Sequence, residues 1–307
     1  MISKLIPAYK SYVWGGKRLV NQFNKNYQGD ILAESWELSC HKDGLSVLMG
    51  SGQSLLQYLA KHPEAAGTAC AKFGEFPLMI KLIDAADNLS IQVHPNDEYA
   101  RVHESQLGKT EVWYIVDCEP DAAIYFGVKK SMTPEQFANA IETNTVCDVL
   151  HRVPVKKGEV YFIEAGTIHA IGKGIVIAEI QQSSNVTYRV YDYDRRDKDG
   201  NARELHIAKA CEVANLTPSK IRNFGKHIAK CDYFVVDEVT VAGKYANVAD
   251  ESSFHSLLVL DGECVVADDS VQIKAAKGDS IFVDAGSGCY TVTGNCHMLL
   301  TRVPRCV

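Results

Sequence analysis

The sequence predicts a mainly β protein built from two jelly-roll β-barrels, with a few helices inserted into the first barrel. Three observations support this fold class. The apolar runs are short and bounded by glycine-containing turns, one strand-and-turn segment occurs twice, and stretches with helical spacing are few. A length of 307 residues is also typical of two domains. We expect a first barrel domain with helical insertions at residues 1–230 and a degenerate barrel-like β domain at residues 231–307.

The duplication is visible in two matched pairs of segments. Lys-Gly-Glu-Val-Tyr-Phe-Ile-Glu-Ala-Gly at residues 157–166 reappears as Lys-Gly-Asp-Ser-Ile-Phe-Val-Asp-Ala-Gly at residues 277–286. The strand predicted at 113–117 has its counterpart at 257–261. Because the order and spacing of both elements agree, a chance match is the weaker explanation. The pattern favours a cupin-type barrel that occurs twice.

The N-terminal third combines short strands with one helical region. Strands and turns are expected within residues 1–50. Residues 54–72 have the apolar spacing of a helix, which Pro63 is expected to break or restart. Residues 76–94 have the pattern of two strands joined by a turn.

Three predicted helices interrupt the strands in the middle of the chain. We expect a polar helix at 97–106 and another after Thr133, a good N-cap residue that is followed by proline. Short strands are expected at 155–195 and a third helix at 203–217. From residue 231 onward the pattern is again one of strands.

The composition is that of a globular protein and argues against several classes of partner. The net charge is −6, whereas binding to nucleic acid or to a membrane surface favours a basic patch. No segment approaches the roughly 20 apolar residues that cross a bilayer, and the N-terminus lacks the apolar stretch of a signal peptide. The ten cysteines include no Cys-x-x-Cys pair, which indicates reduced thiols and a cytoplasmic protein. The sequence leaves the oligomeric state open.

Four residues of types that bind zinc lie on predicted strands. Gln92 and His94 are two positions apart in an apolar strand, so their side chains share one face. Glu111 opens a second strand, and His169 is expected to end a third. Two imidazoles, a carboxylate and an amide oxygen form a ligand set without thiolate. Such a set is typical of a catalytic zinc with a position left open for water or substrate.

The segments that carry these residues resemble those of type I mannose-6-phosphate isomerases of the short bacterial form, which belong to the cupin superfamily. The resemblance covers nearly the whole chain. Its most specific motifs are Gln-x-His-Pro at 92–95, Lys-Thr-Glu at 109–111 and Gly-Thr-Ile-His at 166–169. It implies that the four residues named above bind one zinc ion per chain. It also implies a reversible conversion of mannose 6-phosphate to fructose 6-phosphate, through an enediolate.

Two positions depart from the longer members of that family. Those members carry a histidine directly before the lysine of the Lys-x-Glu motif, where this chain has Gly108. They also carry an aspartate shortly before the active-site arginine, where this chain has Ser184. Both positions are associated with opening of the hexose ring in the family. The sequence therefore does not identify the ring-opening residue of this chain.

Two cationic residues are expected to be catalytic. Lys109 lies two positions before Glu111 on the same strand face, where a nearby metal ion favours its neutral amine and suits it as a general base. Arg189 offers a planar donor fork matched to phosphate or to enediolate oxygens. The alternatives are a solvent-exposed lysine at a strand end and an ordinary ion pair of Arg189 with the nearby Asp192 or Asp194.

Three further residues are expected to bind the substrate. Lys81 ends a very apolar strand, where an ammonium group needs a carboxylate or a substrate phosphate as its partner. Ser90 lies two positions before Gln92 and can donate to a phosphate or sugar oxygen. Trp14 can pack over the apolar face of the sugar, although a core position is the commoner role of a lone tryptophan.

Two other functions fit the same ligand set. An iron-dependent oxidative cupin would use similar residues, but a glutamine ligand beside Lys109 and Arg189 favours a redox-inert metal and an anionic substrate. A non-catalytic sugar-binding cupin would require neither cationic residue.

The second repeat is expected to be a structural barrel without a metal. Counted along the repeat, the position of His169 falls on Cys289, and that of Glu111 falls on His255. No Gln-x-His pair precedes them, and two ligands rarely hold zinc where four are usual. We expect residues 232–307 to bury apolar surface of the first barrel and to help wall its cleft.

Overall fold

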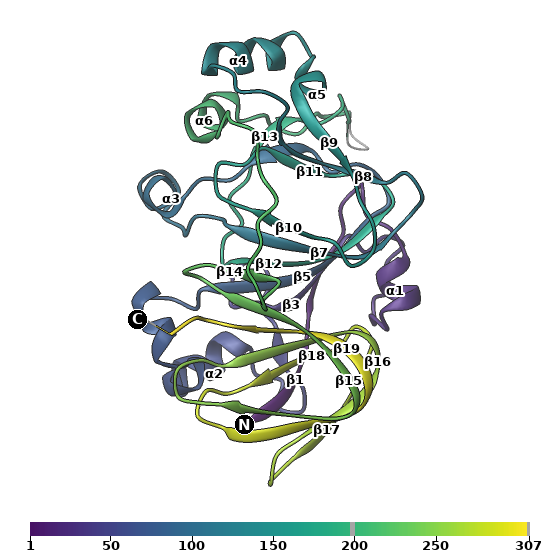
Figure 1. Ribbon diagram of the computed structural model, residues 1–307, viewed down its shortest axis with the longest axis vertical. Helices are drawn as coiled ribbons and strands as arrows, with labels where there is room; N and C mark the ends of the chain where they lie inside the picture. Colours follow the sequence, from purple (N-terminus) through teal and green to yellow (C-terminus); the bar gives the residue numbers. More distant parts are fainter. Residues whose placement is uncertain (197–199, 306–307) are drawn as a thin grey trace. The chain divides into compact units, whose positions relative to one another are not determined.

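The computed structural model describes residues 1–196 and 200–305, and it shows a mainly β protein as predicted (Figure 1). The chain divides into two compact units. Unit 1 contains residues 1–10, 17–82 and 223–307, and unit 2 contains residues 11–16 and 83–222. The domain boundary at residue 230 stays a proposal. Each unit draws on segments that are distant in the sequence.

One antiparallel sheet forms most of unit 1. Its strands lie in the order β14 (Ala229–Lys230), β15 (Val235–Ala249), β19 (Gly288–Arg302), β16 (His255–Ala267), β18 (Ser280–Val283), β1 (Ile2–Ile6) and β4 (Val47–Leu48), and β17 (Gln272–Ala276) pairs with β16. Ile2 of β1 lies opposite Val283 of β18. The N-terminal strand therefore belongs to the same sheet as the C-terminal segment. Val241, Leu257 and Met298 belong to the apolar core of this unit.

The predicted helical region of unit 1 forms three short helices. Helix α2 (Leu55–Lys61) begins with a capping box, in which the side chains and backbone amides of Ser54 and Gln57 bond reciprocally. The 3₁₀ helices η1 (Pro63–Ala66) and η2 (Thr68–Phe73) follow it. The helix thus restarts at Pro63, as expected. Unit 1 also contains α1 (Arg18–Gln22) and the paired strands β2 (Ala8–Lys10) and β3 (Glu34–Leu38).

Unit 2 contains two groups of paired strands. The first is a sheet in the order β13 (Tyr188–Tyr191), β6 (Ile91–Val93), β11 (His169–Ile171), β8 (Ala123–Val128) and β9 (Leu150–Pro154). In the second, β7 (Glu111–Cys118) pairs with β10 (Val160–Ile163) on one side and β12 (Ile175–Gln182) on the other. Strand β5 (Leu78–Ala85) precedes β6, in agreement with the predicted strand pair. The core of this unit includes Ile91, Ile168 and Tyr188.

The helices of unit 2 largely follow the prediction. Helix α3 (Asp97–His103) is capped by Asn96, and α4 (Pro134–Glu142) is capped by Thr133 in a second capping box. A short helix, α5 (Val146–Val149), precedes β9. Helix α6 (Ile207–Val213) is shorter than the predicted 203–217, and the residues before it run along β13. No helix within the described residues is long and apolar enough to cross a bilayer.

The duplicated segments have the same backbone register in the two units. Trp113 lies opposite Tyr161 in unit 2, and their equivalents Leu257 and Ile281 lie opposite each other in unit 1. At the turn, the glycine amide donates at 2.8 Å to a strand carbonyl in both copies, Gly158 to Ile115 and Gly278 to Val259. A chance similarity of sequence would not produce matched registers, so the structure confirms the internal repeat.

The turn glycines of the repeat predict a measurable difference in stability. Gly158 and Gly278 have φ values of +88° and +92°. A β-carbon at residue 278 would lie 2.1 Å from the carbonyl oxygen of Phe23, whereas at residue 158 the nearest atom is 3.9 Å away. Gly158→Ala should cost only the left-handed strain of about 1–2 kcal/mol. Gly278→Ala adds a clash with backbone, so its melting temperature should fall further. Equal melting temperatures would contradict this prediction.

Candidate metal centre

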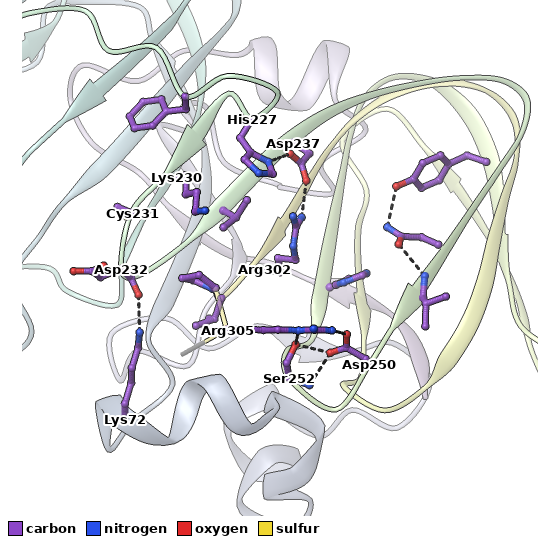
Figure 2. A pocket seen from close by; sticks show the side chains of 18 residues that line it. Lys72, His227, Lys230, Cys231, Asp232, Asp237, Asp250, Ser252, Arg302 and Arg305 are labelled. Atoms are coloured by element: carbon purple, nitrogen blue, oxygen red, sulfur yellow. Dashed lines mark hydrogen bonds and ion pairs between the residues drawn. The ribbon is translucent and has the colours of Figure 1, made fainter. Parts of the chain in front are cut away.

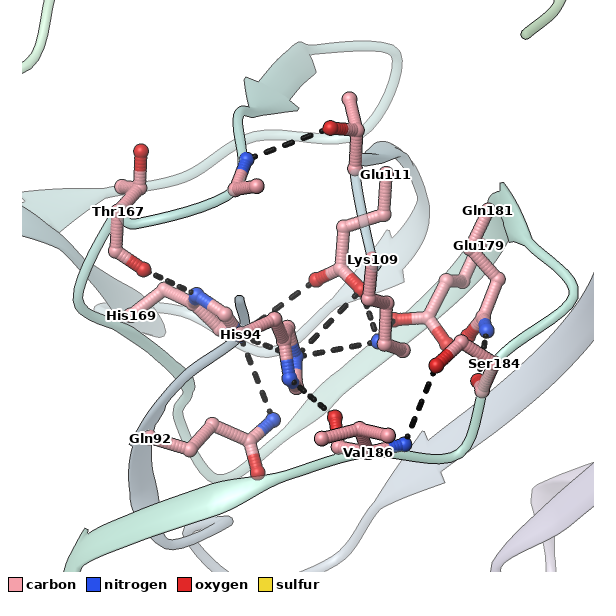
Figure 3. Close-up of polar contacts among 12 residues, drawn as sticks. Gln92, His94, Lys109, Glu111, Thr167, His169, Glu179, Gln181, Ser184 and Val186 are labelled. Carbon is pink, nitrogen blue, oxygen red and sulfur yellow. Dashed lines mark hydrogen bonds and ion pairs between the residues drawn. The ribbon is translucent and has the colours of Figure 1, made fainter. Parts of the chain in front are cut away.

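Strands of unit 2 bring the predicted metal ligands together. Gln92 lies in β6, Glu111 is the first residue of β7, and His94 directly follows β6. His169 lies opposite Gln92. It begins β11, so the prediction that it ends a strand is wrong. The possible ligand atoms of His94, Glu111 and His169 all lie within 4.8 Å of one another, and all three residues are buried (Figure 3).

The ligand atoms surround one small volume. The Nε2 atoms of the two histidines are 3.1 Å apart. The Glu111 carboxylate oxygens lie 3.5 Å from Nε2 of His169 and 3.7 Å from Nε2 of His94. The amide nitrogen of Gln92 is 3.4 Å from Nε2 of His169. Because amide oxygen and nitrogen are assigned rather than observed, the opposite rotamer places the amide oxygen there.

Backbone carbonyls fix the tautomer of both imidazoles. Nδ1 of His94 donates to the carbonyl of Val186 at 2.8 Å, and Nδ1 of His169 donates to the carbonyl of Thr167 at 2.8 Å. Since a carbonyl oxygen only accepts, each neutral ring presents a lone pair at Nε2. Burial, and secondarily the Lys109 ammonium, lowers the pKa of His169 to about 3, so this ring is neutral. Two converging lone pairs and a carboxylate fit a divalent cation.

Lys109 lies within the same cluster. Its ammonium donates to the carboxylate of Glu111, lies 3.1 Å from Nε2 of His94, and is 3.9 Å from the carboxylate of Glu179. The residue is 4% exposed, so the alternative of a solvent-exposed lysine is wrong. The amine of Lys109 is therefore adjacent to the candidate metal ligands His94 and Glu111.

Strand β12 contributes buried polar residues that sequence reasoning missed. Glu179 lies opposite Trp113 and accepts a hydrogen bond from its indole at 3.0 Å. Gln181 lies opposite Glu111, and its amide nitrogen donates to the carbonyl of Ser184 at 2.7 Å. A carboxylate and two amides at the end of a strongly apolar strand were the signal that could have identified them.

The first departure from the longer family members has a steric cause. The amide of Gly108 donates to the side chain of Asp97 at 2.7 Å. A β-carbon at residue 108 would lie 2.5 Å from backbone atoms of Asn96 and Asp97. This backbone therefore has no room for a histidine at that position. Ser184, the second departure, is fully buried, and its hydroxyl accepts from the amide of Val186 at 3.4 Å.

Arg189 lies beside Gln92, one of the predicted metal ligands. It is opposite Gln92 on β13, so the two side chains lie on the same face of the sheet. Its guanidinium donates to the carbonyl of Glu204 at 2.8 Å. The carboxylate of Asp192 is bonded instead by Arg195 and Arg203, both at 2.7 Å. The expected alternative of an ion pair between Arg189 and Asp192 is therefore absent from the described contacts.

The three residues predicted to bind substrate have different surroundings. Lys81 belongs to unit 1, where its ammonium lies 3.6 Å from the carboxylate of Glu34 and 5.1 Å from the ring centre of Trp36. Trp14 is 3% exposed and stacks on Tyr12, and Ser90 is buried just before β6. A carboxylate partner is thus present for Lys81, and substrate contacts by the three residues stay predictions.

The corresponding positions of the second repeat have other partners. His255 lies opposite Val283, as Glu111 lies opposite Ile163. Its Nδ1 is 2.9 Å from the hydroxyl of Tyr290, and Cys289 is exposed. Within residues 1–196 and 200–305, the cluster at β6, β7 and β11 is the one group of three or more such side chains that could hold a metal.

Comparisons with known proteins agree over nearly the whole chain. Residues 2–124 match the phosphomannose isomerase type I catalytic domain, and residues 224–303 match the mannose-6-phosphate isomerase cupin domain. The chain is 35% identical to mannose-6-phosphate isomerase ManA of Bacillus subtilis (strain 168), over 97% of each protein.

Solved structures show the same similarity. The mannose 6-phosphate isomerase from Bacillus subtilis superposes with a TM-score of 0.88 at 31% identity, over 98% of this chain and 99% of the other. A mannose 6-phosphate isomerase bound with zinc and yttrium has the same fold, with a TM-score of 0.78 at 17% identity over 98% of each chain. These matches confirm the predicted fold of cupin-type barrels.

Proposed function

The chain belongs to the type I mannose-6-phosphate isomerase family, and from this membership we propose that it interconverts mannose 6-phosphate and fructose 6-phosphate with one zinc ion per chain. The observation that carries the proposal is the buried group of His94, Glu111 and His169. Zinc is supported by its nitrogen and oxygen donors and by the zinc-bound relative of the same fold. We also propose a cytoplasmic location, which rests on the pattern of cysteines.

The charge of the ligand set suits isomerisation. With Gln92 as a neutral fourth ligand, the four side chains carry a total charge of −1 through Glu111. A divalent ion held there would supply Lewis-acid stabilisation of the negative charge that develops on the enediolate oxygens. The second candidate, an iron-dependent oxidative cupin, is disfavoured because the adjacent Lys109 and Arg189 suit an anionic substrate.

We assign proton transfer to Lys109 and charge stabilisation to Arg189. The amine of Lys109 takes the proton from one of the two substrate carbons, C1 or C2, and returns it to the other. The guanidinium of Arg189 provides paired donors for the enediolate or the phosphate. Its position opposite Gln92 supports this role. Substrate binding by Ser90, Lys81 and Trp14 remains part of the proposal.

One prediction of this proposal concerns the phosphate group of the substrate. Unphosphorylated mannose lacks the anion that cationic residues would bind, so its kcat/KM should be at least about 10²-fold below that of mannose 6-phosphate, the size expected when one charged hydrogen-bond partner is lost. The measurement is a coupled assay with both sugars on the same metal-loaded preparation. Equal kinetics would contradict phosphate recognition and leave the isomerase proposal to be judged on mannose 6-phosphate turnover alone.

The second prediction concerns the number of metal ions. Elemental analysis of the purified protein should find one zinc per chain, because the four proposed ligands all lie in unit 2 and the second repeat keeps only His255 and Cys289 at the matched positions. His255→Ala should leave the metal content unchanged. Two ions per chain, with one lost in His255→Ala, would show that the second repeat also binds metal.

A further inference from the structure

Unit 1 contains a cavity of about 1070 Å³ inside the curve of the long strand β15 (Figure 2). Asp237 near the start of that strand and Asn247 near its end both line the cavity. The start of β16 contributes His255, and the end of β19 contributes Arg302. This volume is just above the range of about 300–1,000 Å³ that is typical of small-molecule sites.

Polar side chains replace apolar ones on the inward face of the strands at this cavity. His255 is two positions before Leu257 on β16, and Arg302 is four positions after Met298 on β19. Even spacing puts each pair on the same face of its strand, and Leu257 and Met298 are core residues. A barrel with a purely structural role would continue the apolar core. This part of the interior is therefore polar, which suits it to a polar ligand.

The internal repeat places one residue of this cavity at a position that corresponds to the candidate metal cluster of unit 2. His255 occupies the place of Glu111, as their matched strand pairings show. Its ring contacts the hydroxyl of Tyr290, and burial together with the charge of Arg302 lowers its pKa to about 4. His255 is therefore a neutral hydrogen-bonding group. The cavity of unit 1 is thus built at the repeat position that carries a metal ligand in unit 2.

Neutral donors and acceptors form part of the cavity lining. The amide nitrogen of Asn247 donates to the hydroxyl of Tyr245 at 2.8 Å. Ser252 adds a second hydroxyl. Groups of this kind recognise hydroxyls, because each can donate to one sugar oxygen and accept from another.

Cationic side chains from separate elements also line the cavity. Its lining contains four Lys or Arg residues and three Asp residues, together with His227. Arg302 pairs with Asp237 at 2.5 Å, and Arg305 pairs with Asp250. The remaining two cations are Lys72, whose ammonium donates to the backbone carbonyl of Asp232 at 3.0 Å, and Lys230; among the described residues, no carboxylate forms an ion pair with either.

This local charge is opposite in sign to that of the protein. The whole chain has a net charge of −6, whereas the cavity lining has more cationic than anionic side chains. An excess of positive charge in a concave site attracts an anion. Hydroxyl-binding groups together with ammonium groups that have no ion pair to a carboxylate match a single class of ligand.

We propose that this cavity is a second small-molecule site, separate in its residues from the metal centre, and that it binds a phosphorylated sugar. Lys72 and Lys230 bind the phosphate, and Tyr245, Asn247 and His255 bind the hydroxyls. This second site is inferred from the residues that line the cavity and does not depend on the isomerase reaction.

The test is a count of binding sites with glucitol 6-phosphate, which has no carbonyl group and cannot be isomerised. Equilibrium dialysis on the metal-loaded protein should find two molecules per chain, one at the metal centre and one in the cavity. Lys230→Glu should reduce the count to one. Lys244→Glu makes the same charge change at an exposed position of β15 outside the cavity lining, and it should keep both sites.

The outcomes separate this proposal from the isomerase assignment. Retention of the second site in Lys230→Glu, or its absence from the wild-type protein, would overturn the proposal. Asn247→Leu should also lose the site, and equal affinity of the cavity for inorganic phosphate and glucitol 6-phosphate would overturn its sugar component. Turnover of mannose 6-phosphate is measured on the same samples and should be unchanged in Lys230→Glu. A wild-type protein without turnover would contradict the proposed function and leave the binding result intact.

Discussion

Replacement of His94 or His169 by alanine is expected to remove both the metal and all measurable isomerase activity. Each ring supplies a lone pair whose direction is fixed by a backbone carbonyl, of Val186 for His94 and of Thr167 for His169. Loss of either nitrogen leaves one imidazole and one carboxylate beside the neutral, weakly donating amide of Gln92, which is fewer strong donors than the three protein ligands usual for catalytic zinc.

The measurement is metal content and kcat on the same dialysed samples. His151→Ala is a suitable control, because His151 is an exposed histidine of unit 2 on β9. The control should keep one zinc and full activity, and added zinc should restore activity to chelated wild-type protein but not to either ligand variant. Full turnover in a verified metal-free preparation would rule out the metal assignment altogether.

Local sequence patterns were sufficient to predict the metal cluster. Gln92 and His94 are two positions apart, and Glu111 and His169 each lie in a short motif at the edge of a strand. The type I mannose-6-phosphate isomerase family, predicted from the same motifs, is confirmed by the comparisons. The predicted helix cap at Thr133 was similarly local, since a capping box depends on residues three apart.

Long-range pairing could not be predicted in the same way. Strand β1 joins β18 across more than 270 residues, and no periodicity within residues 2–6 indicates its partner. Glu179 was missed for a related reason: its role depends on Trp113 opposite it and on the Lys109 ammonium 3.9 Å away. Both neighbours are set by strand register, which a single sequence specifies only weakly.

The sequence also did not reveal why residue 108 is glycine where longer family members have histidine. The sequence shows that a family histidine is missing, but the reason is the close approach of the backbone at Asn96 and Asp97. A histidine there would require the start of helix α3 to move.

Arg189→Ala and Lys109→Ala are expected to keep the metal and lose most of the rate. Neither residue belongs to the proposed ligand set. Arg189 is proposed to stabilise the charge of the substrate, and Lys109 is proposed to transfer its proton. Removal of one preorganised charge donor costs about 10²–10³ in kcat, or about 2.7–4 kcal/mol of transition-state stabilisation. The burial of Lys109 and the position of Arg189 opposite Gln92 put both groups where they can act on a bound sugar.

The two variants should differ in which conservative replacement restores activity. Arg189→Lys keeps the charge but not the paired donors, so it should recover only part of the loss. Lys109→Arg keeps a cation that cannot deprotonate at neutral pH, so it should recover none if Lys109 is the base. Arg152→Ala, at an exposed arginine of β9, is the control for Arg189→Ala. Normal kinetics in either alanine variant with metal retained would remove that residue from the mechanism. Loss of zinc in Lys109→Ala would instead show that the bond from Lys109 to Glu111 holds the ligand carboxylate in place.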